Sequence, residues 1–126
     1  MKNVVISLLI SIIMVIGIIY SIKYLNSVTK DLEKLNDQIE QYINDSDWNK
    51  AYKSSIEYTE MWKEHSKIIK LFIDHQEIDK IEIELWRLPQ YIKEETKDES
   101  LASIHILKFL VDHISGLEKV NIENIF

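Results

Sequence analysis

The stretch that decides the architecture of this chain is Val4–Ile22, with the sequence VVISLLISIIMVIGIIYSI. It is an uninterrupted apolar run, and about 20 apolar residues in a helix cross the hydrocarbon core of a bilayer. Its polar members are three serines, whose hydroxyls can bond back to the helix backbone. A buried core helix would need partners on every side, and the rest of the 126-residue chain is too small to supply them. The run predicts an N-terminal transmembrane helix within residues 1–23.

A cleaved signal peptide is the alternative to a permanent anchor. Cleavage requires small residues one and three positions before the cut, in a polar stretch. Val15 and Gly17 meet the size requirement, but both lie inside the apolar run. Ser21 has Ile19 two positions before it, which fits poorly. We therefore expect the run to be retained as a signal anchor.

The orientation depends on the short tail in front of the run. Lys2 and the terminal amine lie on one side, and Lys23, Lys30 and Lys34 lie on the other, so a count of basic residues does not decide it. A positively charged tail of a few residues is the usual form of a signal anchor whose N-terminus stays inside. We expect a single-pass cell-membrane protein whose C-terminal domain, residues 24–126, is extracytoplasmic.

The composition of that domain restricts its partners. The net charge of −6 becomes −8 when Lys2 and Lys23, which flank the run, are set aside. An acidic domain repels phosphate backbones and anionic lipid surfaces, so we expect neither nucleic-acid nor peripheral lipid binding. With no cysteine, the domain has no disulfides to stabilise it, and its hydrophobic core must suffice.

The domain is predicted to be all-α. Its only glycine and only proline are Gly116 and Pro89, so tight turns and hairpins of strands are scarce. Apolar residues at steps of three and four predict helices at about 24–43, 47–75, 77–95 and 99–115. Pro89 should kink the third helix after Leu85, and Gly116 should end the fourth. The prediction is an antiparallel four-helix bundle of two helical hairpins.

The two hairpin turns look alike. Asp47 and Asp98 are each followed four residues later by an alanine, Ala51 and Ala102. This pattern is weakly similar to the turn of tetratricopeptide-type hairpins. No regular period continues through the chain, so shared turn chemistry is the simpler interpretation.

A second similarity concerns two Asp-His pairs. The segment 70–75, KLFIDH, resembles the segment 108–113, KFLVDH. If both segments close parallel helices of the bundle, the pairs lie at one end, where Asp79 begins the third helix. His75, His113, Asp79 and Asp112 could then bind a divalent cation such as zinc. The alternative, which the lack of metal-ligand spacing favours, is that each histidine caps its own helix terminus.

The other candidates carry weaker signals. Trp48, Tyr52, Tyr58 and Trp62 form an aromatic stripe that could stack on a ligand, but such a stripe at helical spacing usually belongs to the core. His65 and His105 have no nucleophile beside them, and the chain lacks a glycine-rich phosphate loop. We therefore expect no enzymatic activity, no cofactor and no small-molecule substrate.

Several short motifs resemble a known family. In order, they are Asp47-Trp48-x-x-Ala51, then Trp62, Asp74-His75-x-Glu77-Ile78, Arg87-Leu88-x-x-Tyr91-Ile92 and the ending Asn124-Ile125-Phe126. They cover nearly the whole chain and resemble an uncharacterised family of short bacterial proteins with a domain of unknown function, found mainly in spore-forming Gram-positive bacteria. Pro89 departs from the pattern of that family. The resemblance implies an anchored helical domain and a membrane partner, but no activity, substrate or cofactor.

These features together predict a non-enzymatic, membrane-anchored helical interaction module. We expect it to be an accessory subunit of another membrane or envelope protein. The alternative is an ion-responsive sensor domain that binds a divalent metal through the Asp-His cluster.

Overall fold

The computed structural model describes the backbone of residues 1–125 and the side-chain surroundings of residues 1–117. Four helices make up this part of the chain: α1 (Lys2–Asn44), α2 (Trp48–Ile69), α3 (His75–Lys93) and α4 (Lys97–Ile125). No strand occurs among the described residues. The predicted all-α class is confirmed. Phe126, in the ending that resembles the family, lies outside the described residues.

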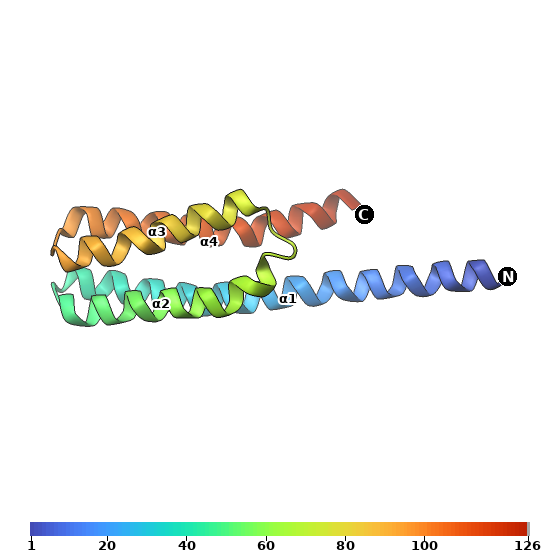
Figure 1. Cartoon of the computed structure of the whole chain (residues 1–126), viewed down its shortest axis with the longest axis horizontal. Coiled ribbons are helices and arrows are strands. Elements are labelled where there is room, and N and C mark those ends of the chain that lie inside the picture. The colour runs from blue at the N-terminus through green and yellow to red at the C-terminus, as the bar shows by residue number, and fades with distance from the viewer. Residues whose placement is uncertain (126) are drawn as a thin grey trace.

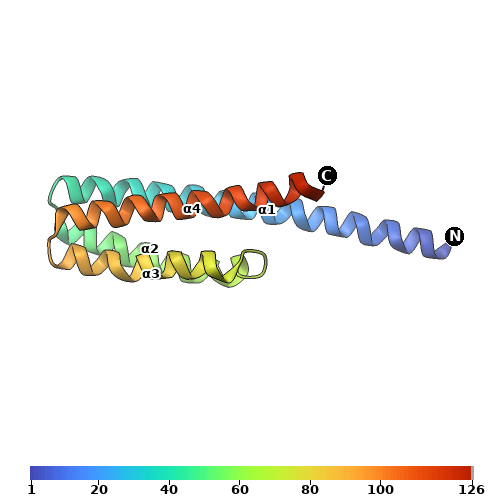
Figure 2. The same cartoon turned by 90° about the horizontal axis from the view of Figure 1, so that it is seen from above.

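The helices form an antiparallel bundle in which each one packs on its neighbours in sequence, and α4 closes the ring against α1 (Figures 1 and 2). The turns α1–α2 and α3–α4 lie at one end, which we call the distal end. The turn α2–α3 lies at the other, proximal end, from which the N-terminal part of α1 projects. This closed ring differs from a tetratricopeptide stack, where successive hairpins pile up in a superhelix.

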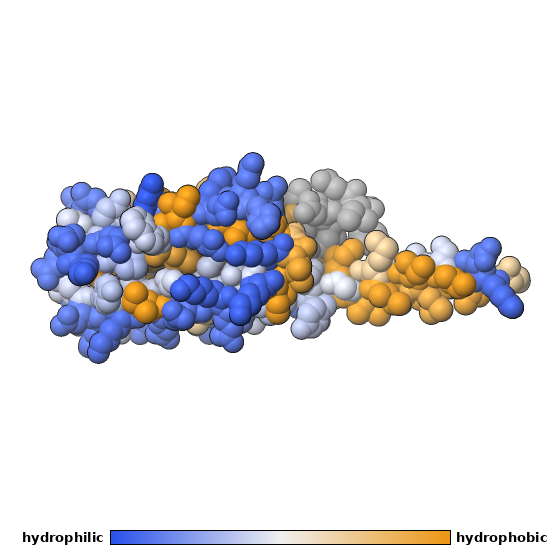
Figure 3. Space-filling view, viewed as in Figure 1, coloured by the Kyte–Doolittle hydropathy of each residue, from blue (hydrophilic) through white to orange (hydrophobic). Residues whose placement is uncertain are grey.

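Helix α1 runs without a break from the apolar run into the bundle. The side chains of the run are exposed along most of its length. From Leu25 onward, buried and exposed side chains alternate along the helix. Figure 3 shows this contrast as an apolar rod leaving a mostly hydrophilic bundle. As predicted, serine hydroxyls in the run bond back to the backbone: Ser11 donates to the Ser7 carbonyl at 3.0 Å and Ser21 to the Ile18 carbonyl at 2.8 Å. The rod is long and apolar enough to cross a membrane.

The core is built from the predicted apolar stripes. Trp62 and Tyr58, its two largest side chains, are each 1% exposed. The remaining core residues are the aliphatic side chains of the stripes on all four helices, among them Leu32, Ile39, Ile81, Leu88, Ile104 and Leu107. Burial of these faces supplies the main favourable free energy of the fold.

Two predicted helix ends are wrong. Helix α2 ends at Ile69 rather than near His75, because Asp74 begins the next helix: its carboxylate accepts a hydrogen bond from the Gln76 amide at 2.8 Å. Helix α4 continues through Gly116 to Ile125, and no glycine adopts a positive φ among the described residues. Helix α3 runs through Pro89 to Lys93, near its predicted end at about residue 95. Packing against neighbouring helices overrides these local signals.

The two distal turns repeat one geometry. Gln41-Tyr42-Ile43 precedes the first turn, and Gln90-Tyr91-Ile92 precedes the second. Ser46 and Glu95 both have φ of 56°. In each turn an amide bonds back five residues, from Asp47 to the Tyr42 carbonyl at 2.9 Å and from Thr96 to the Tyr91 carbonyl at 3.1 Å. This is the Schellman ending of a helix, built here without glycine.

The register of this repeat is not the predicted one. Ala51 corresponds to Ser100, and both are fully buried, whereas Ala102 is exposed. The buried and exposed positions of residues 29–64 recur almost one for one at residues 78–113. The two hairpins are therefore related by an offset of 49 residues. The spacing of the two alanines predicted an offset two residues longer.

Candidate functional site

The two predicted Asp-His pairs lie at different positions on their helices. Asp74 and His75 start α3, whereas Asp112 and His113 lie inside α4 with three further turns of helix after them. The premise that both histidines close a helix is therefore wrong. His75 lies at a helix N-terminus, where the dipole disfavours a cation, so the proposed cap on a C-terminal end does not apply to it.

The four predicted ligands also face different neighbours. His113 Nε2 lies 3.8 Å from Glu77 Oε2 on α3, and its ring stacks on Phe109 at a centroid distance of 5.9 Å. Asp112, one position earlier, lies close to the Glu33 carboxyl group on α1. His75 and Asp79 are exposed on α3. Across the described residues, no three His, Asp or Glu side chains form a group that could hold a metal ion.

The contact between Glu33 and Asp112 places two carboxyl groups together on the α1–α4 face. The hydrogen bond to Asp112, partial burial and the charge of Asp112 raise the pKa of Glu33, while Lys108 acts in the opposite direction. Lys108 also bonds to Asp37 at 3.2 Å. The two carboxyl groups are too exposed to act as a buried acid-base pair.

Polar groups inside the bundle are mostly satisfied. The buried Glu84 carboxylate accepts a hydrogen bond from Ser103 Oγ at 2.8 Å and one from Arg87 Nη1 at 3.1 Å. Asn36 is fully buried and donates to the Ile104 carbonyl at 3.1 Å. Such bonds between helices fix register and topology, since a slipped packing would leave these groups unpaired. The sequence signal was a polar residue within an apolar stripe, and it was missed.

The aromatic stripe on α2 belongs mainly to the core. Tyr58 and Trp62 are buried, Trp48 is half-buried, and Tyr52 is 40% exposed. Burial raises the pKa of the Tyr58 phenol. The core interpretation of Trp62 is therefore confirmed. Its indole N–H has no hydrogen-bond partner within residues 1–117.

A groove of about 430 Å³ lies between α2 and α3, and Trp62 forms part of its wall. Pro89 and Leu85 contribute to its α3 side, and Pro89 offers no N–H to the Leu85 carbonyl. Trp86, 70% exposed, stands on the rim, and Ile83 beside it is 51% exposed. We call the exposed apolar residues of this groove and of the adjoining hollow at Ile83 the α2–α3 strip: Tyr52, Ile56, Ile83 and Trp86.

Sequence reasoning did not single out this strip. Trp86 lies outside the heptad positions Ile81, Leu85 and Leu88, so it points to the polar side of α3. A tryptophan on a polar helix face is the signal that would have found it. Exposed tryptophan is unusual because its large apolar area stays in water.

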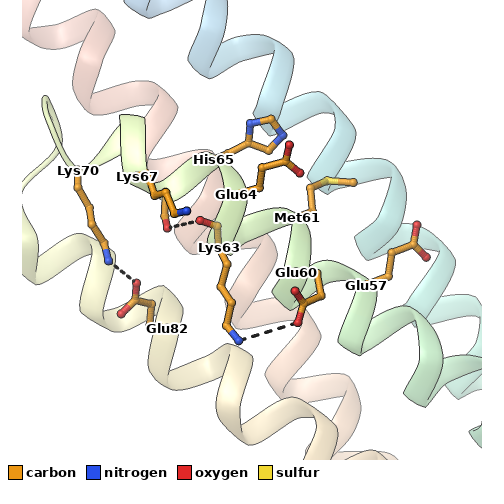
Figure 4. Close-up of a pocket in the computed structure, with 10 residues that line it drawn as sticks. Glu57, Glu60, Met61, Lys63, Glu64, His65, Lys67, Lys70 and Glu82 are labelled. Carbon is orange, nitrogen blue, oxygen red and sulfur yellow. Dashed lines mark hydrogen bonds and ion pairs between the residues drawn. The ribbon is translucent and has the colours of Figure 1, made fainter.

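A charged hollow of about 800 Å³ occupies the outer face of α2 (Figure 4). Lys70 Nζ reaches Glu82 Oε1 on α3 at 3.0 Å, and Lys63 Nζ lies 3.9 Å from Glu60 Oε1. His65 turns away toward α1, where its Nδ1 lies 2.8 Å from the Tyr24 hydroxyl. Exposed ion pairs of this kind contribute little free energy. The hollow is a solvated charged face rather than a binding cavity.

The comparisons with known proteins place the chain in a family. Residues 19–125 match the model of DUF4363, a domain of unknown function. The chain is thus a member of this family, which agrees with the resemblance to an uncharacterised family seen in the sequence. No curated protein and no solved structure matches the chain.

Proposed function

We propose that this protein is a membrane-anchored, non-enzymatic helical interaction module. In this proposal α1 holds the bundle at the cell membrane, and the bundle binds another membrane or envelope protein outside the cytoplasm as an accessory subunit. The observation that carries the proposal is the α2–α3 strip with its exposed Trp86 beside an apolar groove. Tryptophan next to a groove is typical of the few residues that dominate the free energy of protein–protein binding.

The surroundings of the strip support a protein partner. Apolar side chains form its middle, while Lys63, Glu82 and Gln90 border the groove. An apolar centre with a polar rim is the usual composition of a specific protein interface. The exposed apolar rod of α1 supports the membrane anchor, because 18 consecutive residues of it have a mean hydropathy of 2.8.

Affinity purification of the full chain from membranes tests the proposal. We expect a membrane protein to co-purify with the wild type and to be lost with Trp86→Ala. Phe109→Ala is the matched control, because Phe109 is 68% exposed on α4, away from the strip, and should retain the partner. Equal recovery with all three proteins would contradict a role for the strip.

A reporter that is active only outside the cytoplasm, fused after the last residue, tests the orientation. Activity is expected. An inactive but well-expressed fusion would reverse the orientation, and a secreted soluble form without the apolar run would establish cleavage.

A further inference from the structure

The α2–α3 turn, residues 70–74, lies beside the point where the apolar run leaves the bundle (Figure 1). The turn holds three apolar residues, of which Ile73 is buried, Phe72 is half-buried and Leu71 is 82% exposed. Ile68, in the last turn of α2, is 46% exposed. An exposed leucine at the tip of a turn leaves most of its apolar area in water, unless something covers it.

The level of this turn along α1 follows from one contact. His65 Nδ1 lies 2.8 Å from the Tyr24 hydroxyl, so these two residues lie at nearly the same level on antiparallel helices. A helix rises about 1.5 Å per residue, so the end of α2 at Ile69 lies about 6 Å nearer the N-terminus of α1, close to the level of Tyr20. Ile18 and Ile22 are half-buried, which agrees with bundle elements beside them.

The apolar run leaves little freedom to place the membrane elsewhere. Val4–Ile22 extends about 28 Å as a helix, close to the hydrocarbon thickness of about 30 Å. Lys2 and Lys23 limit the run on both sides. If α1 spans the membrane, the hydrocarbon boundary lies near Tyr20–Ile22, and the continuous helix α1 carries the α2–α3 turn to the same level. Helix α4, which continues to Ile125, passes this level beside the run.

We propose that the α2–α3 turn rests in the interface of the bilayer that α1 spans, with Leu71 inserted among the lipid chains and Lys67 beside the headgroups. This inference rests on the proposed membrane anchor. It limits the expectation that the acidic domain avoids lipid, because the contact is made by the apolar side chain of Leu71. Lysines and carboxylates alternate around it: Lys70 pairs with Glu82, Lys63 with Glu60, and Lys67 lies between Glu64 and Asp74 in sequence.

The contact would fix the orientation of the bundle. A single helix allows rotation and tilt about the span, whereas a second point of contact restrains both. The α2–α3 strip would then face a constant direction above the membrane surface, which suits the binding of another membrane protein.

Site-specific labelling of the full chain tests this inference cleanly, because the protein has no cysteine. Single variants Leu71→Cys, Ile10→Cys, Ser46→Cys and Phe109→Cys are labelled with an environment-sensitive fluorophore and reconstituted in phosphatidylcholine–phosphatidylglycerol vesicles. Brominated lipid in the same vesicles quenches only labels that reach the acyl chains. Ile10 reports the anchor, Ser46 the distal end, and Phe109 an exposed apolar side chain within the bundle.

We expect a blue shift and strong quenching at Leu71 and Ile10, and neither effect at Ser46 or Phe109. Quenching at Ile10 without quenching at Leu71 would overturn the inference and leave the anchor intact. A blue-shifted but unquenched Leu71 label would mean that a second copy of the chain, rather than lipid, covers Leu71. An unquenched label at Ile10 would instead contradict the anchor itself.

Discussion

The distal and proximal ends of the bundle belong to the same four helices but expose different chemistry. At the distal end, two turns of matching geometry present Asp45, Ser46, Glu94 and Glu95 to solvent. At the proximal end, a single turn presents Leu71 beside Lys67 and Lys70. The difference teaches that the bundle is polarised along its axis. One end is suited to water, and the other exposes an apolar side chain at the level where the apolar run leaves the bundle.

The distal end also shows how local strain is tolerated. Ser46 and Glu95 occupy a left-handed conformation that costs a non-glycine residue about 1 kcal/mol or more. Each turn offsets this cost by closing two backbone hydrogen bonds on the preceding helix. At the proximal end the described turn has no left-handed residue, and buried Ile73 fixes it instead.

The largest predicted effect tests whether the two ends unfold as one unit. Trp62 lies in the core between them, and Trp62→Ala removes the largest buried side chain. We expect a loss of about 3–5 kcal/mol in the free energy of unfolding, measured by urea denaturation of the full chain in detergent micelles. Hydrogen exchange should accelerate at both ends together. A loss below about 1 kcal/mol would be incompatible with this burial.

Two helix caps compare the ends directly. The Asp74 carboxylate bonds to the Gln76 amide at 2.8 Å at the proximal end, and that of Asp47 bonds to the Lys50 amide at 3.3 Å at the distal end. Asp74→Ala and Asp47→Ala should each lower the free energy of unfolding by about 1 kcal/mol, with Asp74 the larger. Substitution of either residue to Asn instead should retain most of the free energy of unfolding, because the side-chain amide oxygen can also accept a hydrogen bond from the helix N-terminus. Equal values for Ala and Asn would rule out capping.

Glycine substitutions test whether the two distal turns, unlike the proximal turn, are strained. Ser46→Gly and Glu95→Gly remove the cost of the left-handed conformation, so each should raise the free energy of unfolding by about 0.5–1 kcal/mol. Asp45→Gly is the control in the same turn, because Asp45 has φ of −81° and gains nothing. It should be destabilising. Destabilisation by all three changes would show that the turns carry no strain.

A smaller effect concerns pH. The folded state raises the pKa of Glu33, so the stability linked to this group is complete below its unfolded pKa of about 4.3 and is lost as pH rises through the folded pKa. Glu33→Gln should therefore stabilise the protein slightly at pH 7 and have no effect near pH 3. Glu82→Gln, which breaks the 3.0 Å contact to Lys70, should not stabilise it at either pH. Thermal melts across this range measure both.

The smallest expected effect is the response to metal. Zinc or manganese should leave the melting temperature of the full chain unchanged, since no three His, Asp or Glu side chains among the described residues form a group that could hold a metal ion. The double variant His75→Gln/His113→Gln should behave in the same way. A metal-dependent rise that this variant abolishes would restore the ion-responsive function.

The candidate sites show where sequence reasoning reached its limit. The apolar stripes and Trp62 were predictable, because helical periodicity reports which face is buried. The position of Asp112 and His113 inside α4, rather than at its end, was not, because it depends on α4 continuing through Gly116. Trp86 on the polar face of α3 could have pointed to the α2–α3 strip, but the groove beside it depends on how α2 and α3 pack.

The sequence by itself determined the apolar rod, the all-α class, the number of helices and the buried faces, since these follow from local composition and period. Only the tertiary structure decided the helix ends, the register of the two hairpins and the level of the α2–α3 turn relative to the rod. These depend on contacts between residues far apart in the chain, such as Tyr24 with His65 and Asn36 with Ile104. Local propensity is weak compared with such packing, and no periodicity encodes the position of one helix along another.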